Sequence, residues 1–376
     1  MPLRLAMVTP FPANPDRIVG GVAGVARYLA PQLAASGEVE LLVLAPGSEV
    51  VGLREEQGFR VHHLPRPSGP GFLTYWTLEP RRIRAELDRF RPDLVHVQGA
   101  GGWAFGCPYP WLLTIHGLGE RDVLYSDRPL RRVRSAVMGR VEASARRRAS
   151  DVICISPYIT ELVGNQLRGR VWDIENPIDD HFFDVERREV PGRLVFVGRI
   201  GPRKNLLALL EAFDQVAPRF PDAELHVAGD DETQVYTDAC RKRVEDSEAL
   251  RGRVHFLGSL PIERVRALLA GASALVLPSF QETAPLVIEE AMAAGVPALA
   301  SRVCGMPYMI EDGVTGFLFD PERPETIAEK LAVVLGDADL RARLSERSRS
   351  VAEERFRASR VAQRTLEVYQ DIAGRR

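Results

Sequence analysis

The sequence predicts an α/β fold built from two parallel-sheet domains. The chain has 376 residues, which is long for a single hydrophobic core. Short apolar runs alternate with helical patterns along it, as in βαβ units. The alternation pauses at a charged stretch, 179–190, and then restarts. We therefore interpret this stretch as a linker between two domains of the same class.

The first half shows the alternation clearly. Apolar, β-branched runs predict its strands, and longer amphipathic patterns that end near glycine or arginine predict its helices. The predicted strands are 3–8, 40–44, 60–64, 94–97, 112–115 and 151–155, and the predicted helices are 22–35, 81–89 and 131–148.

The second half repeats the pattern. Its predicted strands are 194–197, 224–228, 254–257, 274–277 and the short 298–300, with helical segments between them, and the chain after Pro324 reads as helical. This organisation predicts two Rossmann-like domains, 1–183 and 184–355, facing each other across a cleft. We expect residues 356–376 to form a C-terminal helix that packs back on the first domain.

Composition and charge argue against several classes of function. Net charge is −2, so overall charge gives no case for nucleic-acid binding. No apolar run approaches the roughly 18–20 residues of a membrane span, and the first residues read as a buried strand rather than a signal peptide. The cysteines, Cys107, Cys154, Cys240 and Cys304, are scattered without a metal-binding spacing. Scattered thiols suggest a reduced, cytoplasmic protein.

The most informative segment is PSFQETAPLVIEEAMAAGVP, 278–297. It follows the predicted strand 274–277 and places Glu282 before a helix and Glu290 inside it. Pro285 suits the first helical turn, and Gly295 suits the end. Helix amides at a strand's carboxyl end form an anion site, and the two carboxylates can accept hydrogen bonds from hydroxyls on either side of it. This arrangement suits a nucleotide-sugar, with a diphosphate between two hydroxyl-bearing groups.

The segment FVGRIGPRKNL, 196–206, supplies matching cations. A predicted strand ends at Val197, and Arg199 and Lys204 follow it just before a helix. Arginine can hold two phosphate oxygens, and lysine adds a point charge. Taken alone, the pair could be two solvated surface cations. Beside Glu282 and Glu290 at a matching strand end, a diphosphate clamp is the better interpretation.

These segments resemble a known family. The runs GRIGPRKN, PSFQETAPLVIEEAMAAGVPALAS and EDGVTGFLFDP are similar to those of the retaining GT-B glycosyltransferases of family 4, also called group 1. GGVAGVARYLAPQLAASGEVELLVLAP, 20–46, resembles the family's amino-terminal glycine motif. SPYITELV and ENPIDDHFF resemble its inter-domain region, so the resemblance spans nearly the whole chain.

The resemblance implies roles for individual residues and an activity. It implies that a sugar moves with retention from a nucleoside-diphosphate sugar, UDP favoured and GDP next, to a hydroxyl of a glycan, lipid-linked glycan or small metabolite. Neither a metal nor another cofactor is expected. The implied roles are diphosphate binding by Arg199 and Lys204, sugar binding by Glu282, ribose binding by Glu290, approach to the phosphates by Gly20 and Gly21, and a place for His116 near the reacting centre.

The sequence also departs from the family pattern. Glycines that often follow the first glutamate are replaced by Thr283, Ala284 and Pro285. Pro285 has no N–H, so we expect the phosphate contacts to come from the neighbouring Leu286 and Val287. Further departures stand at Cys304, where a glycine is common, and at Tyr308, where an acid is common. They bear on sugar specificity more than on the reaction.

Other residues leave alternatives open. His116 ends a predicted strand and suits either a structural or a site role, whereas His96 suits a structural or acceptor-side role. Asp230 follows a predicted strand and could contact base or ribose, although a solvated loop is the simpler interpretation.

A dinucleotide fingerprint at Gly20 and Gly21 is disfavoured, because its glycines should directly follow the first strand. The D-x-D pair of GDADL, 336–340, is interpreted as a helix cap.

Three features bear on partners. The predicted helix 131–148 carries seven arginines and a valine stripe, which suits either a solvated face or peripheral contact with an anionic membrane. The loops 62–80 and 99–111 are rich in proline, glycine and aromatics and are expected to face the acceptor. The oligomeric state is left open.

Competing functions remain. A sugar-nucleotide epimerase on the same scaffold would convert its donor without an acceptor. A non-catalytic binder would hold the donor unchanged, and a dehydrogenase would bind NAD.

Overall fold

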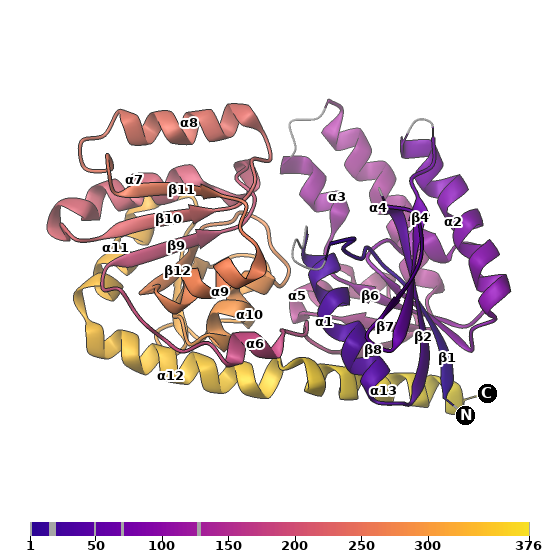
Figure 1. The fold of residues 1–376 in the computed structure, drawn as a ribbon. Coiled ribbons are helices and arrows are strands. Elements are labelled where there is room, and N and C mark those ends of the chain that lie inside the picture. Colours follow the sequence, from indigo (N-terminus) through magenta and orange to yellow (C-terminus); the bar gives the residue numbers. More distant parts are fainter. Residues whose placement is uncertain (1, 15–19, 49, 69–70, 126–128, 376) are drawn as a thin grey trace. The chain divides into compact units, whose positions relative to one another are not determined.

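The computed structural model of the chain describes residues 2–375 except 15–19, 49, 69–70 and 126–128, and only the backbone of 71–76. The chain forms two compact units (Figure 1). Unit 1 comprises 1–123, 130–177 and 357–376, and unit 2 comprises 124–129 and 178–356. Among the described residues, none of the helices is both long and apolar enough to cross a membrane.

Unit 1 is built on an eight-stranded sheet with the order β3-β4-β2-β1-β5-β6-β7-β8. Neighbouring strands are parallel except β3 and β4, which form an antiparallel pair at one edge. The strands are β1 (Leu3–Val8), β2 (Val39–Ser48), β3 (Gly52–Glu56), β4 (Phe59–Pro65), β5 (Leu94–Gln98), β6 (Trp111–Ile115), β7 (Asp151–Cys154) and β8 (Arg170–Asp173).

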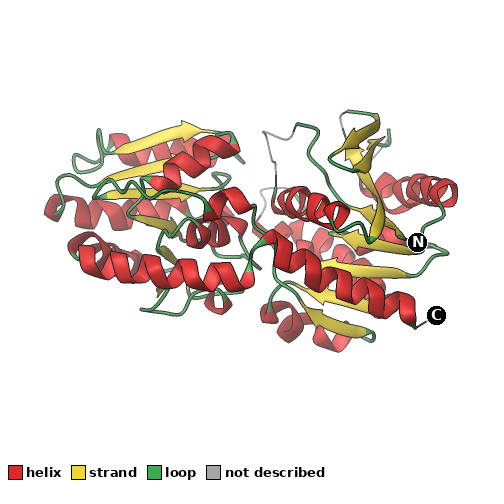
Figure 2. Cartoon of the chain, turned by 60° about the horizontal axis from the view of Figure 1, so that its bottom comes forward, coloured by secondary structure: helices red, strands yellow, loops and turns green. Residues whose placement is uncertain are grey.

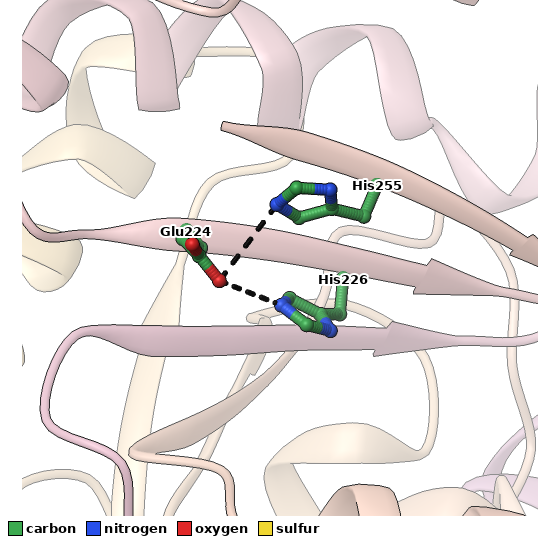
Figure 3. Close-up of side chains that lie close together, drawn as sticks. All are labelled: Glu224, His226 and His255. Carbon is green, nitrogen blue, oxygen red and sulfur yellow. Dashed lines mark hydrogen bonds and ion pairs between the residues drawn. The ribbon is translucent and has the colours of Figure 1, made fainter. Parts of the chain in front are cut away.

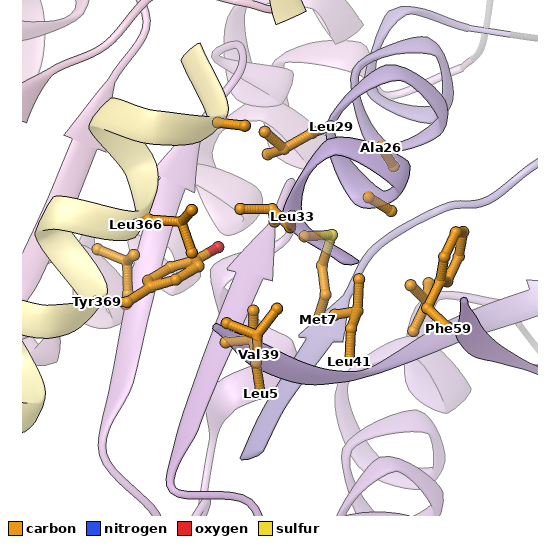
Figure 4. Packing of buried hydrophobic residues seen from close by; sticks show 14 of the residues in the cluster. Leu5, Met7, Ala26, Leu29, Leu33, Val39, Leu41, Phe59, Leu366 and Tyr369 are labelled. Carbon is orange, nitrogen blue, oxygen red and sulfur yellow. The ribbon is translucent and has the colours of Figure 1, made fainter. Parts of the chain in front are cut away.

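Helices cover this sheet (Figure 2). They are α1 (Gly21–Ala35), α2 (Gly71–Phe90), α3 (Gly119–Asp122), α4 (Arg131–Arg148), α5 (Pro157–Val163) and the C-terminal α13 (Ala358–Gly374). Helix α13 packs on α1, and Leu366 and Tyr369 join Leu33 and Leu5 in one buried cluster (Figure 4). The last helix of the chain is therefore part of the core of unit 1, because it buries an apolar face there.

Unit 2 has a six-stranded, all-parallel sheet with the order β11-β10-β9-β12-β13-β14. Its strands are β9 (Arg193–Val197), β10 (Glu224–Ala228), β11 (Val254–Gly258), β12 (Ala274–Leu277), β13 (Ala298–Ser301) and β14 (Gly316–Phe319). Its helices are α6 (Asp180–Phe183), α7 (Leu206–Val216), α8 (Gln234–Glu245), α9 (Ile262–Ala270), α10 (Leu286–Ala293), α11 (Pro324–Gly336) and α12 (Ala338–Arg355). The carboxyl ends of adjacent parallel strands share one edge, which positions the candidate site.

The unit boundaries differ from the predicted ones. The chain leaves unit 1 after Pro177 rather than at 183, and it returns at Arg357 rather than 356. Phe182 and Phe183 are buried, and α6 packs on α10. The stretch 179–190 was predicted as a linker but belongs to unit 2, where Arg188 N–H donates to the Ala270 carbonyl at 2.9 Å. The buried phenylalanines explain why this charged stretch is not a free connector.

Part of the predicted acceptor loop 62–80 is regular structure. Strand β4 continues to Pro65, and helix α2 begins at Gly71 and runs through Pro80. The prediction treated Pro80 as the residue before a helix, whereas the helix accommodates it. Near that proline, the Glu79 carboxylate accepts a hydrogen bond from the Trp103 indole at 2.9 Å. Residues 69–70 lie outside the described part of the chain.

The arginine-rich helix α4 is only partly solvated. Arg146 is buried and pairs with Glu120 at 2.7 Å, whereas Arg131, Arg132 and Arg140 are exposed. Glu142, on the same helix, accepts a hydrogen bond from the Gly101 N–H at 3.2 Å. Burial raises the pKa of Glu142 from its ordinary 4.5 to about 7, although Arg146 acts against this. The helix therefore holds a carboxyl group inside unit 1.

This pKa predicts a pH dependence for unit 1. Between pH 4.5 and about 7 the unfolded chain loses its Glu142 proton before the folded chain does. The contribution of Glu142 to the stability of unit 1 therefore falls as pH rises, by up to about 1.4 kcal/mol per pH unit, and it is measured as the difference between the parent and a variant without this carboxyl group. The Glu142→Gln variant should lack this contribution. Urea titrations followed by tryptophan fluorescence measure it, because Trp76, Trp103, Trp111 and Trp172 all belong to unit 1. An exposed-glutamate control, Glu161→Gln, should follow the parent, and identical pH profiles for parent and Glu142→Gln would contradict the assignment.

Candidate active site

Two neighbouring strands of unit 2 end in loops that touch each other. Strands β9 and β12 are paired, and their loops lead into the short 3₁₀ turn Pro202–Lys204 and into helix α10. The backbone N–H of Phe280 donates to the Arg203 carbonyl at 2.9 Å. The predicted cation segment and the predicted carboxylate segment are therefore joined at the carboxyl edge of the sheet.

Lys204 and Glu282 form the centre of this site. The Lys204 ammonium lies 2.7 Å from Glu282 Oε1, and their side chains are 10% and 11% exposed. Arg203 reaches the same carboxylate oxygen at 2.7 Å and the Gln281 carbonyl at 2.6 Å. Burial alone would raise the pKa of Glu282, but the charges of Lys204 and Arg203 outweigh burial and hold that pKa below its ordinary value. Glu282 is therefore an anion held by two cations.

A glycine makes room for the lysine. Gly198, at the end of β9, has φ +153°, and a Cβ on it would lie 3.3 Å from Lys204 Cε and 3.4 Å from its Nζ. The ammonium thus lies against the backbone of the glycine that precedes Arg199. Gly229, which follows the neighbouring strand β10, approaches the backbone of Gly198 more closely still, because an added Cβ would overlap the Gly198 carbonyl. Small residues at both strand ends let the loops converge.

Arg199 is exposed, and the backbone beside it is fixed. Ile200 N–H donates to the Asp230 carbonyl at 2.8 Å, and Glu232 N–H donates to the Ile200 carbonyl at 2.9 Å. Arg199 is also among the charges that, after burial, lower the pKa of Lys204. The structure thus brings Arg199, Lys204, Glu282 and Asp230 to one sheet edge, where the backbone carbonyl of Asp230 is hydrogen-bonded to Ile200.

Helix α10 carries the second carboxylate. It begins at Leu286 after Pro285, so the amides of Leu286 and Val287 lie in its first turn, where N–H groups lack intrahelical acceptors. Glu290 is buried in this helix. Gly295 follows it with φ +70°, which glycine tolerates and which ends the helix as predicted. The helix therefore presents donors at one end and a carboxylate inside unit 2.

The residues between Glu282 and the helix are tightly held. Gly305 N–H donates to the Glu282 carbonyl at 2.9 Å, and a Cβ on Gly305 would overlap the Thr283 carbonyl. Thr283 is buried and Ala284 is half-buried. Cys304, which stands where a glycine is common, has φ +58° and directs its thiol at Gln281 Oε1 at 3.1 Å. Thr283, Ala284 and Cys304, which depart from the family pattern, therefore lie in the two chain segments that meet at Glu282.

The remaining predicted residues lie in unit 1. His116 follows β6, and its Nε2 is 3.0 Å from Gln98 Oε1. Burial lowers the pKa of His116 to about 4, so the ring is neutral at pH 7. Gly20 precedes α1 with φ +91°, Gly21 is its first residue, and both are exposed.

His96 is structural. Its ring lies 2.6 Å from both Tyr369 Oη and Thr114 Oγ1, which ties β5 to β6 and to α13. Burial lowers its pKa to about 3. The D-x-D pair is a helix cap, as predicted, because Asp337 accepts from Leu340 N–H at 2.8 Å.

Sequence reasoning missed Arg203 and Gln281. Arg203 directly precedes Lys204. In an adjacent pair of cationic residues, the sequence suggests that one side chain binds the diphosphate and that the other points into solvent. Only the turn Pro202–Lys204 shows that both side chains reach Glu282. A second missed cluster, Glu224, His226 and His255, lies on β10 and β11. The sequence did contain a sign of this cluster: Glu224 and His226 are two residues apart on a predicted strand, so both side chains lie on one face of the sheet.

Two parallel-sheet units with this grouping of cations and carboxylates define the GT-B glycosyltransferase class. The profile described as Glycosyltransferase Family 4 matches residues 19–182, and the profile described as Glycosyl transferases group 1 matches residues 177–351. Together the two profiles cover most of the chain, which therefore belongs to the family 4 (group 1) glycosyltransferases, as its motifs predicted.

Similar proteins agree on the fold and the class. An uncharacterized glycosyltransferase of Methanocaldococcus jannaschii is 27% identical, over 98% of each chain. The structure of sucrose-phosphate synthase from Thermosynechococcus elongatus matches with a TM-score of 0.83 and 22% identity, over all of both chains. The structure of Anabaena HepE with UDP-glucose matches with a TM-score of 0.75 and 17% identity, over 98% of this chain and all of that one. The predicted GT-B fold is confirmed, and the epimerase and non-catalytic alternatives are not favoured.

Proposed function

We propose that this glycosyltransferase binds a nucleoside-diphosphate sugar at the carboxyl edge of the unit 2 sheet and transfers the sugar with retention. The observation that carries the proposal is the grouping of Arg203, Lys204 and Glu282 within 2.7 Å contacts at the ends of β9 and β12. These are the strand ends at which ligands bind in open parallel sheets.

The charge of this group suits a diphosphate. Arg199, Arg203 and Lys204 carry three positive charges, and Glu282 cancels one, which leaves a net charge of +2. Burial lowers the pKa of Lys204, and an arriving diphosphate would raise that pKa by adding negative charge beside the ammonium. The amides of Leu286 and Val287 add donors at a helix N-terminus. In this proposal these groups supply the charge stabilisation, and the reaction itself uses no metal.

The carboxylates would orient the two ends of the donor. Glu290 on α10 would accept hydrogen bonds from ribose hydroxyls, with Asp230 as a further contact to base or ribose. Glu282, once a diphosphate engages Lys204, would accept hydrogen bonds from the sugar hydroxyls. Thr283 and Ala284 would line the same subsite. Fixing the sugar against the clamp lowers the barrier through orientation.

Retention follows if the acceptor attacks from the face that the leaving group vacates. The bond from the anomeric carbon to the phosphate oxygen breaks, and its electron pair stays on the diphosphate. The acceptor oxygen bonds to the anomeric carbon on the same face, and its proton passes to the departing phosphate oxygen. Arg199 and Lys204 would stabilise the charge that grows on the diphosphate. In this scheme His116, neutral at pH 7, would accept a hydrogen bond near the reacting centre.

The favoured donor is a UDP-sugar, with a GDP-sugar next, and the transferred group is a hexose. HepE, whose fold this chain shares, has been crystallised with UDP-glucose. The acceptor hydroxyl would belong to a glycan, a lipid-linked glycan or a small metabolite, and Gly20 and Gly21 would approach the donor phosphates from unit 1.

Calorimetric titration of UDP, GDP and ADP tests the donor site. We expect one nucleotide to bind the parent in EDTA and to bind Glu290→Ala at least about tenfold more weakly, because a charged hydrogen-bond acceptor is lost. The exposed Glu245 of α8 provides the matched control, and Glu245→Ala should bind like the parent. Circular dichroism in the same buffer verifies folding. If no nucleotide binds the folded parent, or if Glu290→Ala binds equally well, the proposed donor site is wrong.

A further inference from the structure

Three side chains on the outer strands of the unit 2 sheet point at one another (Figure 3). Glu224 and His226 lie two residues apart on β10, so both face the same side of the sheet. His255 on β11 is the register partner of His226. Glu224 Oε2 is 3.0 Å from His226 Nε2 and 3.7 Å from His255 Nε2, and the donor atoms all lie within 4.8 Å of one another.

These distances suit a bound transition metal. A tetrahedral Zn²⁺ with ligand bonds of about 2.0–2.1 Å separates its donor atoms by about 3.3 Å. The two carboxylate–imidazole separations bracket that value, and the ligand atoms lie within 4.8 Å of one another, so side-chain rotations that bring the two imidazoles together would complete the geometry. Two imidazole nitrogens and one carboxylate oxygen are ordinary Zn²⁺ ligands, and a water molecule would take the fourth position.

One ligand atom lacks a hydrogen-bond partner among the residues that the structure describes. His255 Nε2 is buried and makes no hydrogen bond to the described part of the chain, because its 3.7 Å distance to the Glu224 carboxylate is too long for one. His226 Nε2, in contrast, is hydrogen-bonded to Glu224. A buried ring nitrogen left unpaired is costly. A metal ion between the three groups would satisfy His255 Nε2 and would move the His226 proton to Nδ1.

We propose that Glu224, His226 and His255 bind Zn²⁺ and that the ion ties the edge strand β11 to β10. Strand β11 is the last strand of its sheet, so only β10 pairs with it. A metal link between the two strands would hold this edge in register. The site is half-open: the side chains of Glu224, His226 and His255 are 43%, 16% and 38% exposed, which leaves room for entry of the ion.

This site is separate from the donor site. Glu224 begins β10, whereas the donor loops follow the carboxyl ends of the strands. Four residues of strand, about 13 Å, separate Glu224 from Ala228 at that edge. The ion would therefore stabilise unit 2 without entering the sugar transfer. Arg193, the register partner of Glu224, is a nearby positive charge that opposes cation binding, so we expect modest affinity.

Metal titration of the full chain tests the proposal. The parent is stripped with EDTA, freed of the chelator, and titrated with Zn²⁺ by calorimetry and with Co²⁺ by visible absorption. We expect one ion per chain, a tetrahedral-type Co²⁺ spectrum and a rise in melting temperature with Zn²⁺. His226→Gln and His255→Gln should each bind at least about tenfold more weakly and lose the rise, because each removes a ligand.

A matched histidine distinguishes this site from ordinary surface binding. His181, also in unit 2, is exposed and pairs with a single carboxylate, Asp179. The His181→Gln variant should keep the stoichiometry, the spectrum and the melting shift of the parent. Equal Zn²⁺ binding by the parent and both site variants, with each protein folded by circular dichroism, would overturn the proposal. So would an octahedral-type Co²⁺ spectrum in the parent.

Discussion

Replacement of Lys204 by alanine is expected to lower the rate of donor cleavage by about 100- to 1,000-fold, the loss typical when one group that stabilises a developing negative charge is removed. The ammonium is buried and lies 2.7 Å from Glu282, so no solvent cation can replace it in the same place. The release of nucleoside diphosphate from the preferred donor measures the rate, because it requires no knowledge of the acceptor.

The chain offers a matched control for this experiment. It contains only three lysines, and Lys242 is exposed on α8 of the same unit. Lys242→Ala should cleave the donor like the parent. Because Arg203 still pairs with Glu282 in Lys204→Ala, the carboxylate keeps one of its two cations and the loop keeps a tether. Unchanged turnover in a folded Lys204→Ala protein would show that the clamp is not formed by this lysine.

The second large effect is expected at Gly305. An alanine Cβ there would overlap the Thr283 carbonyl, which is backbone and cannot rotate away. The loop from 282 to 285 would have to shift, and the hydrogen bond from Gly305 N–H to the Glu282 carbonyl would be strained. We expect Gly305→Ala to destabilise unit 2 by about 1–3 kcal/mol, as overpacking does, and to weaken nucleotide binding. Calorimetric melting and nucleotide titration measure the two effects.

The control separates a steric cost from a general glycine effect. Gly305 has φ −85°, which any residue tolerates, so the expected penalty comes from overlap and not from backbone conformation. Gly336, at the end of α11, has only ordinary contacts at 3.8 Å to Phe220. Gly336→Ala should be neutral or slightly stabilising. If Gly305→Ala melts and binds nucleotide like the parent, the close approach of the two loops is not required.

Motif spacing predicted much of the site because it reports local structure. The strand before Glu282, the helix after Pro285 and its end at Gly295 follow from apolar runs and from the backbone preferences of proline and glycine. The same reasoning placed Lys204 beside the end of β9. It could not show that Lys204 and Glu282 touch, because that contact depends on which strands are neighbours.

Elements with weak apolar patterns escaped prediction. Strands β3 and β8 were missed, and both are largely exposed strands at the two edges of the unit 1 sheet. Exposed edge strands bury little apolar surface, so they lack the alternation that marks a strand in sequence. The charged stretch 179–190 was predicted as a linker, although it belongs to unit 2. Its buried phenylalanines, Phe182 and Phe183, are few among many charged residues, so its composition resembles that of an exposed connector.

The sequence alone determined the α/β class and the repetition of the pattern, and it predicted Lys204, Glu282 and Glu290 as candidate site residues, because these follow from local periodicity and short-range spacing. The tertiary structure alone decided that Arg203 shares Glu282 with Lys204 and that Gly305 lies against Thr283. It also decided that His255 meets Glu224 and His226 across two strands. The physical reason is the same in each case: these contacts join residues far apart in the chain, and strand order and packing set their positions.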